Sequence, residues 1–181
     1  MAATSPITDW QRCYSAGVAL YRQKDYPGAI EQFQKAIELK ADFAEPYYGW
    51  GSVLYDQKNY PEAIQKFQKA IEFRADFAEP YYGWGFALSL YNQKKYPEAI
   101  QKFQKAIELK ADFAEPYYGW GFVLYNQKDY PEAIQKFQKA IELRADYAEP
   151  YYGWGFVLYI PITRFQFCAS KGVPSRRCLG P

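Results

Sequence analysis

The chain has 181 residues, of which 49% are hydrophobic and 20% aromatic, and its 22 basic and 20 acidic side chains leave a net charge of +2 at pH 7. It contains no histidine, which removes the commonest general base and metal ligand of enzymes. A charge so close to zero is untypical of nucleic-acid-binding proteins, which neutralise many phosphates. We therefore expect no catalytic residues, no metal site, no cofactor and no nucleic-acid partner.

Two phrases recur along the chain at intervals of 34, 36 and 34 residues. A period of this length is typical of a solenoid, in which each unit buries its apolar side chains only against its neighbours. Because a stacked array has no enclosed pocket, we expect function on its surfaces and ends. The phrase Ala-Glu-Pro-Tyr-Tyr-Gly-Trp-Gly begins at Ala44, Ala78, Ala114 and Ala148, and Phe-Gln-Lys-Ala-Ile-Glu begins at Phe33, Phe67, Phe103 and Phe137.

Each unit is predicted to contain two helices. The apolar residues of 114–128 recur mainly three and four apart, and those of 131–143 do so more cleanly. The Gln-Lys-Asp-Tyr stretch between the two segments is long enough only for an antiparallel helical hairpin. Asp112 and Asp129 each precede a glutamate by three residues, which predicts a capping box at both helix starts.

This unit resembles the tetratricopeptide repeat. Its second half has the family pattern Ala-x3-Phe-x2-Ala in every full copy, and its first half carries the family's aromatic, glycine and leucine positions with the aromatics permuted, as around Trp50 and Gly51. The glycine is expected to be the tight contact between the paired helices. Alanine replaces the proline that closes the family's second helix, as at Ala75. The resemblance spans Trp10 to Tyr159 and implies an all-α, right-handed α-solenoid of helix-turn-helix repeats.

The repeat in the middle of the chain carries an insertion of two residues near Ser89 and Leu90. We expect the insertion either to lengthen the first helix of that repeat or to loosen the turn before Tyr96. The predicted division of the chain is a lead-in at 1–9, repeats at 10–43, 44–77, 78–113 and 114–147, a half repeat at 148–159 without a capping helix, and a basic tail at 160–181.

The resemblance also implies a concave groove, because in this family the first helices of successive repeats line one. The groove of this chain would be aromatic and mildly acidic, and glycines such as Gly49 and Gly153 favour a close approach of another ring or backbone. Packing of the rings between neighbouring helices is the alternative interpretation. The residues of the expected contact surface are Tyr48, Tyr55, Tyr82, Phe86, Tyr118, Phe122, Tyr125, Tyr152 and Phe156, with Glu45, Glu79, Glu115 and Glu149 at the rim.

The last predicted helix, at 148–159, has no second helix to pack against. Solenoids normally finish with a polar capping helix, so we expect Tyr151, Trp154 and Leu158 to mediate end-to-end association. A head-to-tail contact produces a ring or an open helical filament. Our leading hypothesis is a non-catalytic protein-interaction scaffold, a homo-oligomer that assembles head-to-tail into a helical oligomer, filament or tube. The alternative is a monomeric adaptor that binds an extended apolar or basic peptide in the groove.

The tail has apolar residues spaced three and four apart between Pro161 and Gly172, which fits a short capping helix, although its alternation also fits a strand. Cys168 and Cys178 leave open a disulfide within it, and Cys13 is expected to be a buried thiol. We see no signal peptide and no segment apolar enough for membrane insertion, so the cytoplasm is the default location.

Overall fold

The computed structural model describes residues 8–159, and within this range it contains nine α-helices, one short 3-10 helix and no strand. The all-α class is therefore confirmed. The expectations for the tail, a capping helix and a disulfide between Cys168 and Cys178, lie outside the described residues. None of the helices at 8–159 is long and apolar enough to cross a membrane.

The chain divides into two compact units, one up to Lys95 and one from Tyr96, and each is described by itself. The division falls inside the segment expected as a repeat at 78–113. Unit 1 contains α1 (Asp9–Arg22), α2 (Tyr26–Leu39), α3 (Ala44–Asp56), α4 (Tyr60–Phe73), α5 (Ala78–Tyr91) and the 3-10 helix η1 (Gln93–Lys95). Unit 2 contains α6 (Tyr96–Leu109), α7 (Ala114–Asn126), α8 (Tyr130–Leu143) and α9 (Ala148–Tyr159).

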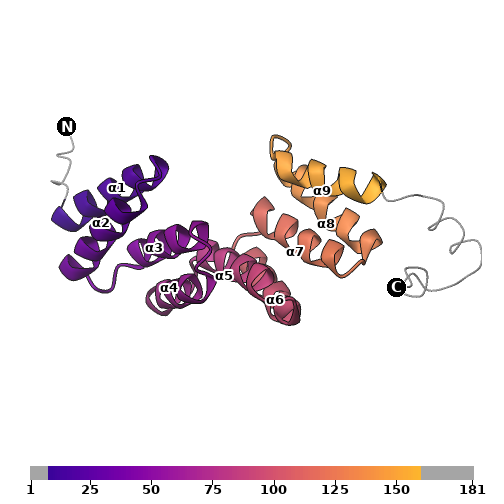
Figure 1. Ribbon diagram of the computed structural model, residues 1–181. Coiled ribbons are helices and arrows are strands. Elements are labelled where there is room, and N and C mark those ends of the chain that lie inside the picture. The colour runs from indigo at the N-terminus through magenta and orange to yellow at the C-terminus, as the bar shows by residue number, and fades with distance from the viewer. Residues whose placement is uncertain (1–7, 160–181) are drawn as a thin grey trace, which may run out of the picture. The chain divides into compact units, whose positions relative to one another are not determined.

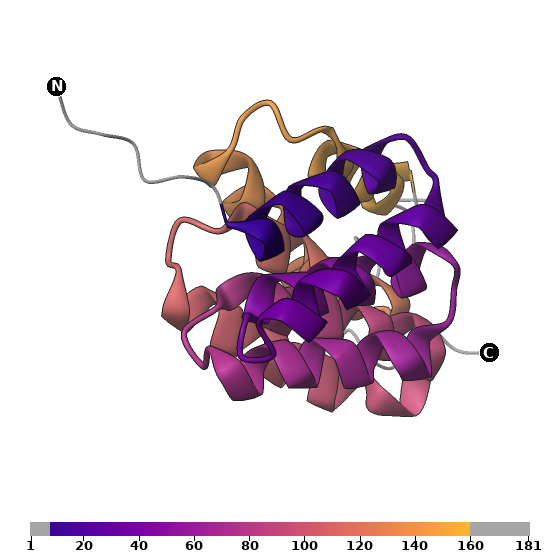
Figure 2. The same cartoon turned by 90° about the vertical axis from the view of Figure 1, so that its left-hand side faces the viewer.

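Inside each unit the helices pack in the alternating order of a solenoid (Figures 1 and 2). In unit 1, α1 pairs with α2 and α3 pairs with α4, and α2 and α4 also pack on the first helix that follows each of them. In unit 2, α7 pairs with α8, and α8 packs on α9. Each of these second helices is therefore held between two first helices, its own and the next.

The predicted hairpin turns are confirmed, and their centre is a lysine in the left-handed region. Lys24, Lys58 and Lys128 have φ of 62, 62 and 63°. In the last of these turns the Lys128 N–H donates to the Tyr125 carbonyl and the Asp129 N–H donates to the Leu124 carbonyl, both at 2.9 Å. This pair of bonds ends a helix and reverses the chain within three residues.

The insertion near Ser89 has both of its expected effects. Helix α5 has 14 residues, whereas α3 and α7 have 13. After it, Asn92 is extended with φ −157° and the turn continues as η1, in place of the lysine-centred turn.

The predicted capping boxes are wrong. Asp112 is not the N-cap of α7, because the helix begins one residue later and Phe113 is the N-cap. Asp129 is the N-cap of α8, but its side chain accepts no capping hydrogen bond. The first hairpin shows a reason. There the Asp25 carboxylate accepts from the Gly28 N–H at 3.1 Å, and a Cβ at Gly28 would lie 2.5 Å from a carboxylate oxygen. The other second helices carry glutamate at this position, so the carboxylate could not lie there as Asp25 does without shifting.

The core is built around phenylalanines that each lie between two glycines. Phe33, Phe67 and Phe137 are 0 or 1% exposed. A Cβ added to Gly51, in the paired first helix, would lie 2.7 Å from the Phe67 ring, which confirms the predicted tight contact. A Cβ on Gly83, in the next first helix, would lie 2.8 Å from the same ring.

The same packing explains Gly49 and Gly153, the glycines that the sequence suggested were approached by another ring or backbone. Cβ atoms at Gly49 and Gly153 would lie 2.6 and 2.7 Å from the rings of Phe33 and Phe137. The ring that approaches each of these glycines therefore belongs to the chain itself, and the glycines do not indicate an external partner. Cys13, expected to be buried, is only half-buried, as are its equivalents Tyr47, Tyr81 and Tyr117.

Candidate functional site

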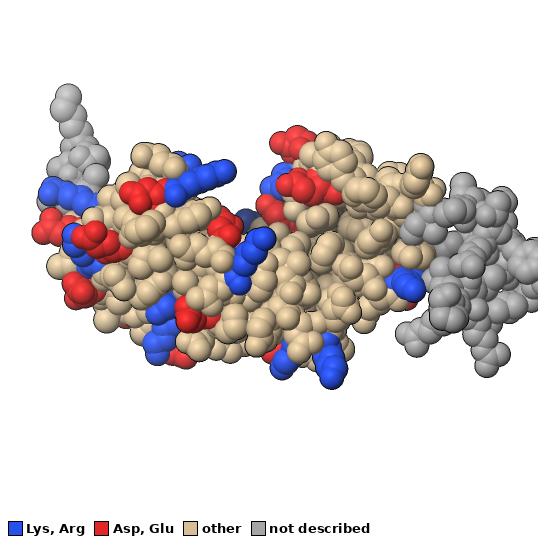
Figure 3. All heavy atoms as spheres, in the orientation of Figure 1, with Lys and Arg blue, Asp and Glu red and all other residues tan. Residues whose placement is uncertain are grey.

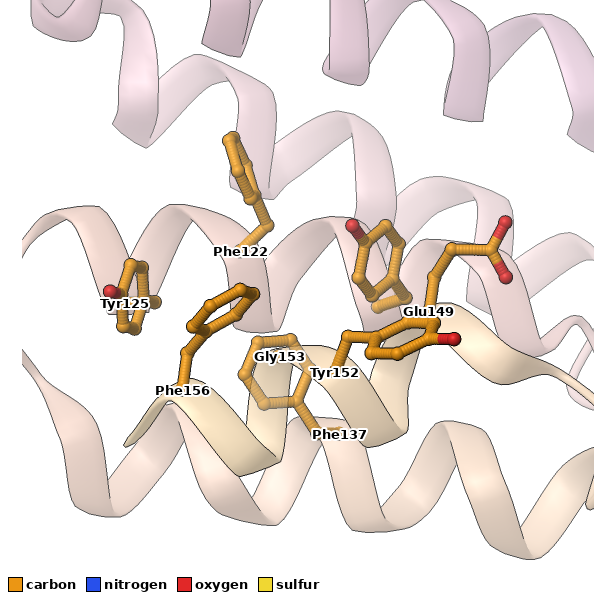
Figure 4. A pocket seen from close by; sticks show the side chains of 8 residues that line it. Phe122, Tyr125, Phe137, Glu149, Tyr152, Gly153 and Phe156 are labelled. Carbon is orange, nitrogen blue, oxygen red and sulfur yellow. The ribbon is translucent and has the colours of Figure 1, made fainter. Parts of the chain in front are cut away.

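A cavity of about 320 Å³ lies between α7 and α9 in unit 2 (Figure 4). In the view of Figure 4, Tyr125 lies at one end, Tyr152 and the Glu149 carboxylate lie at the other, and Phe156 lies between them. The lining residues are Tyr118, Phe122, Tyr125, Phe137, Glu149, Tyr152, Gly153 and Phe156. Six of these eight are residues of the expected groove, and sequence reasoning missed Phe137 and Gly153.

Helical spacing explains how the cavity is assembled. Tyr118, Phe122 and Tyr125 follow one another at intervals of four and three residues, so they share one face of α7. The α9 residues that line the cavity follow the same rule. Phe137 of α8 reaches the cavity from the core, because α8 packs against both first helices.

The aromatic rings of the cavity differ in how much they are covered. Tyr118 is half-buried and its ring packs on Phe137 and Tyr147, with centroids 6.0 and 5.6 Å apart. In contrast, Tyr152 and Phe156 on α9 are 68% and 64% exposed. The α7 side of the cavity is thus set by internal packing, whereas the α9 side presents rings to solvent.

One carboxylate faces this aromatic surface. Burial, followed by the charge of Glu149, raises the pKa of the Tyr118 hydroxyl above its ordinary value. Among the described residues Glu149 has no ion-pair partner. The equivalent Glu115 on α7 accepts a hydrogen bond from Arg144 at 2.6 Å, and the guanidinium of that arginine lies 4.1 Å from the Tyr147 ring centroid.

Unit 1 repeats this arrangement with its charges paired. Glu45 accepts from Arg74, whose guanidinium lies 3.7 Å from the Phe77 ring centroid. Glu45 and Glu115 are therefore each neutralised by the arginine that follows the second helix of the same hairpin. For Glu149 the described residues supply no such cation.

The groove positions of unit 1 pack largely among themselves. The Tyr48 ring contacts Phe67 and Phe77 with centroids 6.0 and 5.3 Å apart. Tyr55 contacts Phe86 at 6.2 Å, and Tyr82 contacts the same ring at 5.6 Å. Packing between helices, the alternative interpretation of the aromatic stripe, therefore accounts for much of it in this unit.

The outer side of α9 is the second candidate surface. Leu158 is 55% exposed, whereas Leu54 and Leu124, its equivalents in complete hairpins, are 7% and 6% exposed. A Cβ on Gly155 would have no described atom within 4 Å, although its equivalents Gly51 and Gly121 are pressed against a phenylalanine. We call Tyr151, Gly155 and Leu158 the open face of α9.

The three residues expected to mediate end-to-end association do not all lie on the same side of α9. Tyr151 and Leu158 are 45% and 55% exposed on the open face, but Trp154 packs against the core cluster that contains Phe137 and Val157. Sequence reasoning did not single out Gly155. Its alignment with Gly51 and Gly121 was the signal that could have found it.

The outer side of α1, the first helix of unit 1, has a different character. Arg12, Ser15 and Ala19 are exposed there. Their equivalents in α3 are the buried Pro46 and Val53 and the glycine Gly49, which packs on Phe33. The side of α1 that no helix of unit 1 covers is thus polar or small.

Comparison with known proteins gives both the family and the fold. A family model described as TPR repeat matches residues 17–58, 51–90, 87–128 and 121–159. No curated protein matches the sequence. Among solved structures, MamA from Desulfovibrio magneticus RS-1, from its residue 41 to the end, is 27% identical with a TM-score of 0.64, and 77% of each chain is covered.

Two more distant structures share the fold alone. The TPR protein TTC0263 of Thermus thermophilus is 16% identical with a TM-score of 0.72, covering 82% of this chain and 80% of its own. PilF of Pseudomonas aeruginosa is 19% identical with a TM-score of 0.74, covering 93% of this chain and 72% of its own. Because the matched repeats run almost without a break from residue 17 to residue 159, this chain belongs to the tetratricopeptide repeat family.

Proposed function

We propose that this protein is a non-catalytic interaction scaffold that self-associates through the open face of α9. Membership of the tetratricopeptide repeat family and the solenoid fold support a protein-interaction scaffold. The observation that supports the self-association is the contrast between Leu158 at 55% exposure and its equivalent Leu124 at 6%. The complete hairpins of α3 with α4 and of α7 with α8 bury this leucine, so its exposure on α9 leaves a prepared contact surface unused.

The open face offers apolar side chains whose burial stabilises a contact. Covering one leucine-sized side chain contributes about 1.5 to 3 kcal/mol, and the open face also offers the ring of Tyr151. Figure 3 shows mainly uncharged surface over α9, with acidic side chains near its start. The open face itself, formed by Tyr151, Gly155 and Leu158, carries no charged side chain, so a partner need not desolvate charged groups there.

The arrangement we favour is a closed dimer in which each of two copies covers the open face of α9 of the other. Head-to-tail assembly, expected from the sequence, would place the open face against the outer side of α1, where Arg12 and Ser15 are exposed. An apolar face gains less from that contact than from a second apolar face. A contact between identical surfaces closes as a two-fold dimer, whereas a head-to-tail contact gives a ring, filament or tube.

Sedimentation velocity of the full chain over a concentration series tests this function. We expect a monomer-dimer equilibrium whose Kd rises about tenfold or more in Leu158→Lys, since about 1.4 kcal/mol corresponds to each factor of ten. Leu39→Lys is the matched control, because Leu39 is 56% exposed on α2, and it should leave the equilibrium unchanged. A monomer at every concentration would contradict the proposal, as would a dimer that tolerates Leu158→Lys. Species larger than a dimer would restore the head-to-tail arrangement.

The cavity favours a second candidate function, an adaptor that binds an extended basic peptide. Glu149 lies beside its aromatic lining and has no ion-pair partner among the described residues, whereas the equivalent Glu115 holds Arg144. An arginine side chain from a ligand would find a carboxylate and aromatic rings there.

Fluorescence anisotropy with a labelled decapeptide of alternating arginine and leucine tests this candidate. We expect Phe122→Ser, which gives α7 the residue that α3 has at Ser52, to weaken binding about tenfold by removing roughly 1.5 kcal/mol of apolar contact. The control is the same peptide with glutamate in place of arginine, which should not bind. Equal affinity of the two peptides would exclude a role for Glu149.

A further inference from the structure

The open face of α9 includes, at Gly155, a position that a phenylalanine ring fills in the described hairpins, and we call this position the slot. Cβ atoms on Gly17, Gly51 and Gly121 would lie 2.7, 2.7 and 2.6 Å from a phenylalanine ring of the paired second helix. At Gly155 no described atom lies within 4 Å of the same point. An aromatic ring is therefore the side chain that the equivalent glycines accept.

The helix that carries such a ring has small residues on both sides of it. Ala63 lies four residues before Phe67 and Ala70 lies three residues after it, and both alanines are 0% exposed. A proline at Pro61 stands two residues before the first alanine, in the first turn of α4. An occupant of the slot at Gly155 needs this pattern: proline, small residue, phenylalanine, small residue.

The residues that follow α9 carry this pattern in the same register. Thr163 lies four residues before Phe167 and Ser170 lies three residues after it, with Pro161 two residues before the threonine. The other phenylalanine of the segment does not fit, because proline stands four residues before Phe165. Residues 161–170 thus share the proline, the phenylalanine and the two small positions of the second-helix motif, with hydroxyl-bearing residues in place of alanine, and differ from it at Arg164, where α8 has Ile134.

This segment is too close in sequence to fill the slot of its own chain. In the three hairpins the phenylalanine follows its glycine by sixteen residues, from Gly17 to Phe33, Gly51 to Phe67 and Gly121 to Phe137. From Gly155 to Phe167 there are only twelve, because the residues of the turn are missing. If α9 continued straight, twelve residues would place these two positions about 18 Å apart.

Folding back within one chain would require the last turn of α9 to unwind. A helical hairpin needs a loop of about two to five residues, and only unwinding near Tyr159 could supply them. Unwinding would remove Leu158 from the surface that the returning segment has to cover. A second copy of the chain has no such restriction.

We propose that the open face of α9 receives residues 161–170 of a second copy, with Phe167 of that copy in the slot at Gly155, and that the two copies exchange these segments reciprocally. This inference rests on the proposed self-association and names the surface that completes it. Exchange of identical segments gives a closed dimer, and a connection too short to fold back favours exchange over closure within one chain.

Two substitutions in the full chain test the identity of the segment. Phe167→Ala should raise the Kd of the dimer about tenfold or more in sedimentation velocity, and Phe165→Ala, its matched control, should leave it unchanged. If Leu158→Lys dissociates the dimer and Phe167→Ala does not, the exchange is wrong while the proposed self-association stands. If the wild-type chain is a monomer, both fail.

A third variant tests the missing turn directly. Inserting Asn-Gln-Lys-Asp, the sequence of residues 126–129, between Tyr159 and Ile160 restores the sixteen-residue spacing. We expect this variant to become a monomer with undiminished helical circular dichroism, because the segment then reaches its own slot. An inserted variant that dimerises as tightly as the wild type would overturn the exchange.

Discussion

Replacing Phe137 by alanine should lower the free energy of unfolding by about 3 to 5 kcal/mol, the usual cost of removing a large buried aromatic side chain. The ring is 1% exposed and lies against Gly121 of its own hairpin and Gly153 of the next helix. Neither glycine has a side chain that can move into the space. The cavity left by the substitution would therefore stay open, which places the cost near the upper end of this range.

Guanidinium denaturation followed by circular dichroism measures this effect. Phe156→Ala is the control, because it removes the same side chain from a position that is 64% exposed, and it should change the free energy of unfolding by no more than about 0.5 kcal/mol. Equal losses in the two variants would show that Phe137 does not hold α7, α8 and α9 together.

The features that lie within one helix or one hairpin could be predicted from the sequence. The three-residue turn and the contact of Gly51 with Phe67 follow from the period of the repeat. The shared face of Tyr118 and Phe122 follows from helical spacing. For the same reason, most of the cavity lining in unit 2 was among the expected residues, since each of its two walls is a single helix face.

The features that depend on which side chains of different helices meet could not be predicted in this way. Arg144 reaches Glu115 from 29 residues away and neutralises a rim that the sequence suggested was acidic. The ring that approaches Gly49 belongs to Phe33 of the preceding hairpin. Neither contact has a spacing signal within one helix, because each joins two different helices: Glu115 and Arg144 lie at α7 and α8 of one hairpin, whereas Phe33 and Gly49 lie in two successive hairpins.

The two outer first helices of the described chain differ in a way that bears on assembly. Both second helices of unit 1 press a phenylalanine against the next first helix, as Phe33 does at Gly49. Helix α1 has Ser15 at that position and leaves it exposed, so its outer side is adapted to solvent. Helix α9 retains the glycine and leucine of an interior repeat on its outer side, which is why we assign the contact surface to α9 alone.

A single substitution at two equivalent positions should have opposite effects on stability. Gly121→Ala should lower the free energy of unfolding by about 1 to 3 kcal/mol, because the new methyl group would lie 2.6 Å from the Phe137 ring and force it to shift. Gly155→Ala should raise it by about 0.5 to 1 kcal/mol, since alanine is the better helix former and no described atom lies within 4 Å of its Cβ. Thermal or guanidinium unfolding at low protein concentration, where the chain is a monomer, measures both. Destabilisation of the monomer by Gly155→Ala would show that the slot is already filled.

The same variant links stability to assembly. If the slot at Gly155 receives the ring of Phe167 from a second copy, the methyl group of alanine meets that ring as it would meet Phe137 at Gly121. Gly155→Ala should therefore stabilise the monomer and weaken the dimer, so that its advantage over the wild type shrinks as the protein concentration rises. Unfolding midpoints of the variant and the wild type, measured across a concentration series, show whether the difference between them shrinks. A gain in stability that is equal at all concentrations would mean that no ring enters the slot.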